Sequence, residues 1–303
     1  MVSVPRGPAR RPRRLVVLAV LGSLVLLAVT SGALAAADQT GGGGQSAAPP
    51  DRVADAHGTA ARPAAELAAD PANATGEGVT VAVLDSGIDD GHPDLAGRVT
   101  ERVDLTGAEP THPENGTDQS GHGTFVAGVL GGSGAASDGD HAGVAPGAAL
   151  VDVRIMAENG DADEATVAEG IEYAVSEADA DIVLLSLQSV GSEPGVIEER
   201  VEWANDRGAL VVASAGNRAG PRSVTTPGTS RAALTVGAAD GAGTVWERSA
   251  YGPTRAGAFK PELLAPGVGI VGPQAGYGGG SEAGEESGGE QADPYARRTG
   301  TSI

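Results

Sequence analysis

The 303 residues include 40 acidic and 20 basic side chains, so the chain carries a net charge of −20. Such an excess of negative charge argues against nucleic acid as a partner. The sequence contains no cysteine, so disulfides are excluded and the fold must be stabilised by packing or by bound metal ions.

The first 35 residues have the layout of a secretory signal peptide. Five arginines and no acidic residue precede an apolar run over 15–29, and Ala33–Ala35 supplies the small residues of a cleavage site. We therefore expect cleavage near Ala35 and a secreted, extracellular protein. An uncleaved membrane anchor is the alternative, because the apolar stretch over 15–37 is nearly long enough to span a bilayer. The pair Arg13 and Arg14 also permits twin-arginine export.

Removal of this segment makes the chain more acidic. Without its five arginines, 15 basic residues face 40 acidic ones, which gives a charge of about −25. This charge favours solubility and suits salty surroundings, in which ions screen the self-repulsion of a halophilic protein. A genome that favours Arg and Asp for other reasons is the alternative explanation.

The composition and apolar pattern of the sequence change near residue 76. Residues 36–75 are rich in Ala, Gly and Pro and predict a linker or the remnant of a prosegment. Beyond them, apolar β-branched runs over 78–84, 148–156, 181–187 and 209–214 predict strands. One-sided apolar spacing predicts helices over 165–178 and 195–207.

Alternation of apolar strands with helices predicts an α/β domain over residues 76–303. Its sheet is expected to be mainly parallel, with helices on both faces, and its active site to lie at the carboxyl ends of the strands. Two stretches interrupt the pattern: residues 104–119 are polar and irregular, and the Gly/Glu-rich stretch over 276–291 predicts a disordered surface loop.

Three side chains suited to acyl transfer stand out. Asp85 directly follows the first predicted strand, His122 lies in the motif SGHGTFVAG, and Ser302 lies in TGTSI at the end of the sequence. Acyl transfer needs a nucleophile, a base and a group that orients the base. Asp, His, Ser is one of the three chain orders known for this triad. The motif around His122 is the most specific of the three, because strands that end in Asp-Ser-Gly are common.

These motifs resemble those of the subtilisin-like serine proteases, the subtilases. Further blocks match in the same order, namely AGVAPGAAL over 142–150, Ser186-Leu187, SAGN over 214–217, YGPT over 251–254 and KPELLAPG over 260–267. The resemblance covers residues 76–303. It implies a subtilisin-like fold and a secreted serine endopeptidase that hydrolyses peptide bonds through an acyl-enzyme. Its partners would be polypeptide substrates, with no stable partner protein evident, and its chemistry would require no cofactor.

The resemblance also implies roles for individual residues. Ser302 is the expected nucleophile, His122 the general base, Asp85 the residue that orients it, and Asn217 the side-chain donor to the oxyanion. The expected walls of the substrate pocket are Ser186, Leu187, Gln188, Ala213, Ser214, Ala215 and Gly216. Gln188 departs from the family, which usually places glycine there. We also hypothesise that Arg218, at the pocket rim, favours acidic or neutral side chains on the acyl side of the cut bond.

Two acidic loops are candidates for binding a structural calcium ion. Asp94, in the motif HPDL, matches a calcium ligand of some subtilases, and Asp138 and Asp140 lie in a loop that could supply further oxygens. Neither loop has a complete set of oxygen ligands, so solvated acidic turns are the alternative interpretation.

The resemblance finally implies elements beyond this sequence. In subtilases a folded prosegment precedes the catalytic domain, and the serine begins a buried helix. We therefore expect a catalytic domain that is C-terminally incomplete and, for the chain as given, an inactive fragment. The alternative from another class is a non-catalytic exported binding module with the subtilase fold. Membrane association is expected only through an uncleaved signal or a missing C-terminus.

Overall fold

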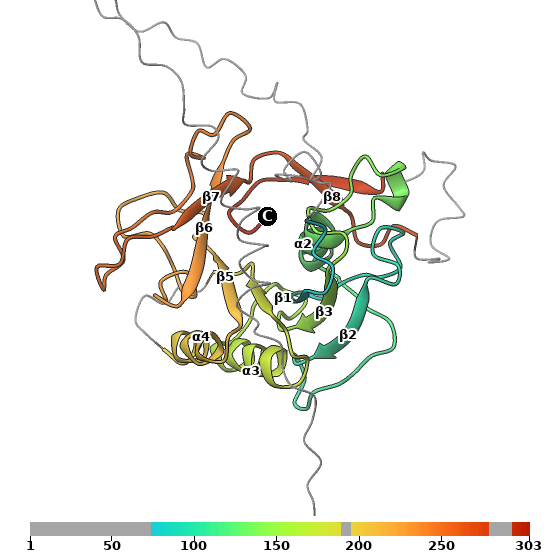
Figure 1. The fold of residues 1–303 in the computed structure, drawn as a ribbon, viewed down its shortest axis with the longest axis horizontal. Helices are drawn as coiled ribbons and strands as arrows, with labels where there is room; N and C mark the ends of the chain where they lie inside the picture. The colour runs from blue at the N-terminus through green and yellow to red at the C-terminus, as the bar shows by residue number, and fades with distance from the viewer. Residues whose placement is uncertain (1–73, 189–194, 279–292) are drawn as a thin grey trace, which may run out of the picture.

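The computed structural model describes residues 74–188, 195–278 and 293–303, and a seven-stranded sheet lies at the centre of this part of the chain (Figure 1). Its spatial order is β2-β3-β1-β4-β5-β6-β7, and all neighbouring strands run parallel. The strands are β1 (Thr80–Asp85), β2 (Val99–Asp104), β3 (Ala149–Arg154), β4 (Ile182–Leu185), β5 (Leu210–Ser214), β6 (Ala233–Ala239) and β7 (Leu263–Pro266).

The direction of the strand order changes at β1. The chain adds β2 and β3 on one side of β1 and then β4 to β7 on the other, so β1 pairs with both β3 and β4. In open parallel sheets such a switch point creates a crevice at the carboxyl ends of the strands. The last residue of β1 is Asp85, so the topology places this side chain at the mouth of the crevice.

Helices cover both faces of the sheet, as predicted. α3 (Glu164–Ser176) and α4 (Val196–Asp206) pack against each other on one face, and α2 (His122–Gly131) lies on the other (Figure 1). Because side chains alternate along a strand, Ala82 and Leu84 of β1 join the core beneath α3 and α4. Val83 instead contacts the core that holds Val126 of α2.

Local signals explain where two of these helices begin and end. Asp163 caps α3 by accepting hydrogen bonds from the N–H groups of Ala165 (3.0 Å) and Thr166 (2.9 Å). Gly208, two residues beyond α4, has a φ of 89°, a conformation that favours glycine and ends many helices.

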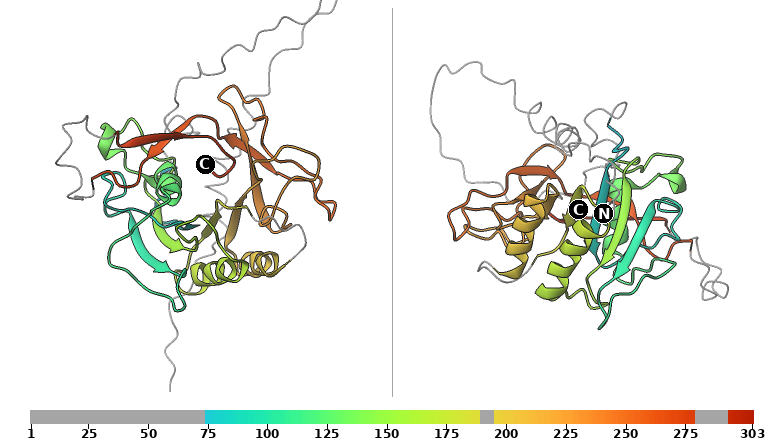
Figure 2. Two further views of the ribbon diagram at one scale, coloured as in Figure 1. Left: turned by 180° about the vertical axis from the view of Figure 1, so that it is seen from behind. Right: turned by 60° about the horizontal axis from the view of Figure 1, so that its bottom comes forward.

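A two-stranded antiparallel ribbon lies against α2. It is formed by β8 (Ile270–Pro273) and β9 (Tyr295–Arg298), and β8 packs directly on the helix. A Cβ atom at Gly128 of α2 would clash with the ring of Pro273, so glycine is required for this close approach. The ribbon leads to Ser302, and the C-terminus lies between β6 and α2 in both opposed views (Figures 1 and 2).

The predicted elements are confirmed with small changes at their ends. The strands over 78–84, 148–156, 181–187 and 209–214 correspond to β1, β3, β4 and β5, and the two helices to α3 and α4. The predicted signal segment, the linker up to residue 73 and most of the Gly/Glu-rich stretch lie outside the described residues. Within the described ranges, no helix is both long and apolar enough to cross a membrane.

Candidate active site

Asp85 is held rigidly at the end of β1. Its side chain is 1% exposed, and its Oδ1 accepts hydrogen bonds from the backbone N–H of Ser86 (2.8 Å) and from the Ser86 hydroxyl (3.2 Å). A buried carboxylate needs such donors, because desolvation penalises the charged form. Its carboxylate therefore has a fixed orientation before any substrate arrives.

His122 is the first residue of α2 and contacts Asp85. Its Nδ1 lies 2.8 Å from Oδ1 and 2.9 Å from Oδ2 of Asp85, and its Nε2 lies 3.3 Å from Oγ of Ser302. The three residues come from segments separated by 37 and 180 positions. The fold thus brings together the three side chains that the sequence predicted, in the order carboxylate, imidazole, hydroxyl.

The environment of His122 suits a general base. Burial alone lowers its pKa, but the hydrogen bond and the charge of Asp85 together outweigh this effect, so the pKa is raised above its ordinary value of 6.5. The charge of Arg298 acts against this rise, and that of Asp118 adds to it. Asp85 therefore makes the imidazole a stronger proton acceptor.

Asp118 anchors the start of α2 and was not predicted from the sequence. Its Oδ1 accepts hydrogen bonds from the N–H of Gly121 and the hydroxyl of Ser86, both at 2.8 Å. Its Oδ2 accepts from the N–H (2.8 Å) and the hydroxyl (2.7 Å) of Thr124. The carboxylate satisfies N–H groups that a helix N-terminus leaves unpaired, and it connects α2 to the turn after Asp85. An acidic residue shortly before a helix start was the available signal.

Asn217 lies beside Ser302 with its side-chain amide oriented by Thr301. Oδ1 of Asn217 accepts hydrogen bonds from the N–H (2.9 Å) and the hydroxyl (3.0 Å) of Thr301. This assignment directs Nδ2 away from Thr301. A Cβ atom built on Gly300 would lie 3.4 Å from Ser302 Oγ and 3.5 Å from Asn217 Nδ2. The predicted nucleophile and the predicted amide donor therefore border the same small space.

The predicted pocket walls lie side by side after β4 and β5. The Ser214 hydroxyl donates a hydrogen bond to the carbonyl of Leu187 (2.9 Å), which joins the two walls. Oε1 of Gln188 accepts the backbone N–H of Asn217 (3.2 Å), so the side chain that departs from the family crosses between the walls. Ser186, Ala213, Ala215 and Gly216 are buried along them, and Arg218 is exposed beyond Asn217.

The surroundings of Asp94 do not fit a calcium ligand. Both carboxylate oxygens accept hydrogen bonds from protein groups, Oδ1 from the N–H of Ala136 and Oδ2 from the hydroxyl of Tyr295, each at 2.8 Å. In the ranges that the structure describes, no three carboxylate or imidazole side chains gather in a way that could hold a metal ion. Asp94 instead fastens β9, which leads to Ser302, to the body of the domain.

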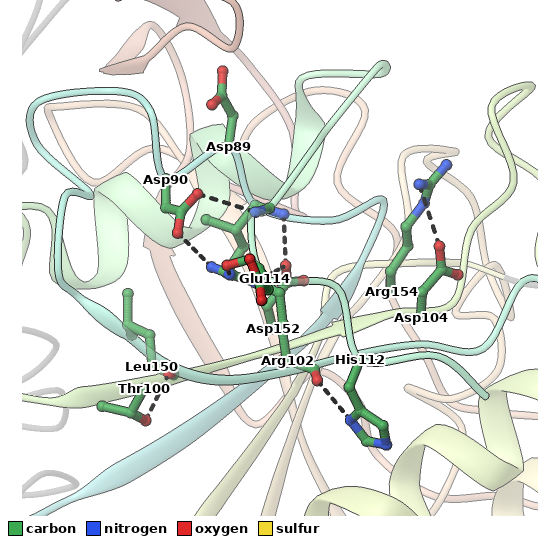
Figure 3. A network of polar contacts seen from close by, with 12 residues as sticks. Asp89, Asp90, Thr100, Arg102, Asp104, His112, Glu114, Leu150, Asp152 and Arg154 are labelled. Atoms are coloured by element: carbon green, nitrogen blue, oxygen red, sulfur yellow. Dashed lines mark hydrogen bonds and ion pairs between the residues drawn. The ribbon is translucent and has the colours of Figure 1, made fainter. Parts of the chain in front are cut away.

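A second buried network supports the turn after β1 (Figure 3). Asp152 of β3 accepts the backbone N–H of Ile88 (3.2 Å), and Nε of Arg102 lies 4.0 Å from the same carboxylate oxygen. Arg102 also binds Asp90 and the carbonyl of Glu114. Burial raises the pKa of Asp152 to about 7, despite the opposing effects of the Ile88 hydrogen bond and the Arg102 charge. This pair was not predicted from the sequence, because both residues lie within strands and no local motif marks them.

This geometry matches the Asp-His-Ser arrangement that characterises serine hydrolases, placed at the switch point of a parallel α/β sheet. The comparisons then identify the family. The model of the subtilase family matches residues 76–303. The chain belongs to that family.

Individual relatives agree with this assignment. The chain is 37% identical to the serine protease AprX of Bacillus subtilis (strain 168) over 233 residues, which cover 70% of this chain and 51% of that protein. It is 38% identical to thermitase of Thermoactinomyces vulgaris over 144 residues, or 48% of this chain and 49% of thermitase. It thus spans about half the length of these curated relatives.

Solved structures show the same fold. A psychrophilic protease matches with a TM-score of 0.63 and 31% identity, over 75% of this chain and 73% of that one. Sphericase matches with the same TM-score and coverage at 28% identity. The expected mainly parallel, subtilisin-like sheet is therefore confirmed.

Proposed function

We propose that the protein is a secreted serine endopeptidase that cleaves polypeptide substrates through an acyl-enzyme. The observation that carries this proposal is the contact series from Asp85 to His122 to Ser302, at 2.8 and 3.3 Å. A buried carboxylate, an imidazole with a raised pKa and a hydroxyl within reach of its second nitrogen are the parts that acyl transfer requires.

The reaction follows from the placement of these groups. Ser302 Oγ attacks the peptide carbonyl carbon while Nε2 of His122 takes the hydroxyl proton. His122 then gives this proton to the leaving amine as the C–N bond breaks, and a water molecule repeats the sequence to release the acyl group. Asp85 holds the imidazole tautomer and stabilises the imidazolium. The 3.3 Å separation is typical of a free enzyme, in which catalytic hydrogen bonds shorten only on substrate binding.

Asn217 supplies the second part of the chemistry. As the carbonyl oxygen acquires negative charge, Nδ2 of Asn217 donates to it, together with the backbone N–H of Ser302. Thr301 holds the amide oxygen of Asn217, so the donor needs no reorientation during the reaction. The reaction requires no cofactor, and the contacts of Asp94 give no support to the earlier expectation of calcium there.

The substrate would lie extended between the walls at the ends of β4 and β5. Its backbone would form hydrogen bonds with the backbone of these walls, like an added β-strand. Gln188 narrows this space, and the exposed Arg218 at its rim favours acidic or neutral side chains on the acyl side of the cut bond. Cleavage profiling on a peptide library tests this part separately, and a preference for Lys or Arg at those positions would contradict it.

We further propose that residues 1–35 direct export and that residues 36–75 link this segment to the catalytic domain. The argument rests on the arginine-rich start, the apolar run and the small residues around Ala35. The names of the relatives do not establish whether this chain is exported, because they include both a major intracellular and a minor extracellular protease. N-terminal sequencing of the exported protein should give a start near Ala36.

The central experiment is hydrolysis of a protein substrate by the exported chain, compared with a Ser302→Ala variant. Turnover that disappears in Ser302→Ala, together with covalent labelling of Ser302 by a fluorophosphonate, would support the proposal. It would also contradict the expectation that this polypeptide is inactive. If the folded chain binds peptides without cleaving them and Ser302 is not labelled, the non-catalytic binding module becomes the better description.

A further inference from the structure

A groove of about 450 Å³ opens beside Gly121, the residue that directly precedes His122. It runs between the loop before α2 and the β8–β9 ribbon. The side chains and backbone that line it include Ser120, Gly121, Gln274, Ala275, Gly276 and Arg298. Gly121 directly precedes His122, whose Nε2 lies 3.3 Å from Oγ of Ser302, so the groove adjoins the backbone that carries the predicted base.

Arg298 brings a fixed positive charge to this groove. Its guanidinium lies 5.3 Å from the centre of the Phe125 ring, which is fully buried in α2. A Cβ atom at Gly121 would lie 3.2 Å from Nη2 of Arg298, so the guanidinium packs against the backbone just before the catalytic histidine. Among the described residues, no ion pair to Arg298 is found. Its charge also reaches His122, whose pKa it lowers.

The carboxylate that also borders the groove is already engaged. Asp118 lines the groove, but its two oxygens accept four hydrogen bonds, from Gly121, Ser86 and the two donor groups of Thr124. These neutral donors occupy its oxygens and leave little capacity to accept further hydrogen bonds from Arg298 or a ligand, while its negative charge remains. Within the described part of the chain, Arg298 is thus the positively charged side chain of the groove and forms no ion pair.

The direction of proton transfer decides which part of a substrate enters the groove. His122 must give its proton to the leaving nitrogen, so the peptide beyond that nitrogen passes on the histidine side of Ser302. The acyl part lies on the other side, where Asn217 and the walls after β4 and β5 border Ser302. The groove beside Gly121 therefore receives residues that follow the cut bond.

We propose that Arg298 makes the protein select peptides with an acidic side chain at the first or second position after the cut bond. The inference rests on the proposed peptidase function and extends it to the leaving-group side. A guanidinium offers paired N–H donors that match the geometry of a carboxylate. Its contact with the Phe125 ring restricts the side chain before a ligand binds, so less conformational entropy is lost on binding.

The test measures hydrolysis of matched peptides that differ only at these two positions, with Glu, Gln or Lys in each. We expect the unmodified chain to cleave the Glu peptides about tenfold faster in kcat/KM than the Gln peptides, and Arg298→Gln to reduce this ratio to below about twofold. Arg298→Glu should invert the preference toward Lys. Arg297→Gln is the matched control, because Arg297 is the exposed neighbour on β9 whose side chain points to the other face.

A binding measurement makes the result independent of turnover. Fluorescence anisotropy of the same labelled peptides on Ser302→Ala, with and without Arg298→Gln, reports selection by the groove even if no peptide is cleaved. Equal cleavage and equal binding of Glu and Gln peptides by chains that retain Arg298 would overturn the inference and leave the peptidase proposal intact. Absence of cleavage with a retained, Arg298-dependent preference in binding would overturn the peptidase proposal alone.

Discussion

Asn217 is the residue whose removal should affect catalysis most directly, with a smaller cost to stability from the two Thr301 donors that lose their acceptor. Its side chain is partly exposed, and its Nδ2 borders the space beside Ser302 Oγ. We expect Asn217→Ala to lower kcat by about 10²–10³-fold with little change in KM, because the donor acts mainly on charge that develops in the transition state. Steady-state kinetics on a chromogenic peptide checks this. Asn205→Ala, at an exposed position on α4, is the matched control and should leave both constants unchanged.

Asp118 acts on the site through His122. Its carboxylate accepts four hydrogen bonds at the start of α2. We expect Asp118→Asn to lower the free energy of unfolding by about 1–3 kcal/mol, since an amide oxygen cannot accept all of them and buried donors are left unpaired. Loss of the negative charge, which raises the pKa of His122, should also move the acid limb of the kcat/KM profile to lower pH.

A variant in the cap of another helix distinguishes the loss of stability from the change in the pKa of His122. Asp163→Asn removes an equivalent carboxylate from the start of α3, far from the triad in sequence and on the opposite face of the sheet. It should lower the melting temperature but leave the pH profile of kcat/KM in place. An Asp118→Asn variant with an unshifted acid limb would show that Asp118 has only a structural role.

At the scale of the elements, β3 contains an unusual pH-sensitive group. The carboxyl of Asp152 is buried, Oδ1 has no hydrogen-bond partner in the described part of the chain, and the pKa is raised to about 7. A carboxyl whose folded pKa exceeds its unfolded pKa of 3.8 favours folding when protonated. Its contribution to stability is therefore complete below about pH 4 and is lost as the pH rises toward 7.

Asp152→Asn should remove this dependence. We expect the variant to melt at a higher temperature than the unmodified chain at pH 8 and at a similar temperature near pH 4.5, because an amide keeps an acceptor for Ile88 and carries no buried charge. Thermal unfolding monitored by circular dichroism across this range provides the measurement. A difference in melting temperature that does not change with pH would mean that Arg102 keeps Asp152 ionised throughout (Figure 3).

The elements also show how far the sequence alone could predict this molecule. Apolar β-branched runs identified β1, β3, β4 and β5, because these strands are buried in the sheet. β2 was missed, since its sequence VTERVD lies at the sheet edge and only Val103 among its residues is buried. β8 and β9 were missed because a short ribbon packed on one helix leaves no long periodic pattern.

The same reasoning applies to the site. Asp85, His122 and Ser302 were predictable because each lies in a local motif of fixed chemistry. Thr301 and Arg298 have their contacts with residues that are distant in sequence, such as the contact of Thr301 with Asn217, 84 positions away. Asp118 differs, because Gly121 and Thr124 lie three and six positions from it and a helix-start signal was available. The calcium interpretation of Asp94, which the sequence left open beside a solvated acidic turn, gains no support for the same reason, because the hydroxyl of Tyr295, 201 positions away, donates a hydrogen bond to this carboxylate.

At the scale of the whole molecule, net charge sets the conditions under which the fold is stable. The chain carries −20, or about −25 without the arginines of the first 35 residues. Repulsion among these charges opposes compaction. Added salt shortens the screening distance from about 10 Å at 0.1 M to about 3 Å at 1 M, so we expect the melting temperature to rise with sodium chloride concentration over this range.

Screening must be separated from the general strengthening of apolar burial by salts. Sodium chloride and sucrose at matched osmolality are therefore compared, because sucrose stabilises folded proteins by exclusion from their surface but does not screen charge. If repulsion limits stability, chloride raises the melting temperature more than sucrose does. The excess should shrink at pH 4.5, where protonation of carboxylates reduces the net charge. If both solutes raise the melting temperature equally, charge screening does not stabilise the fold. The acidic composition would then be explained by solubility alone.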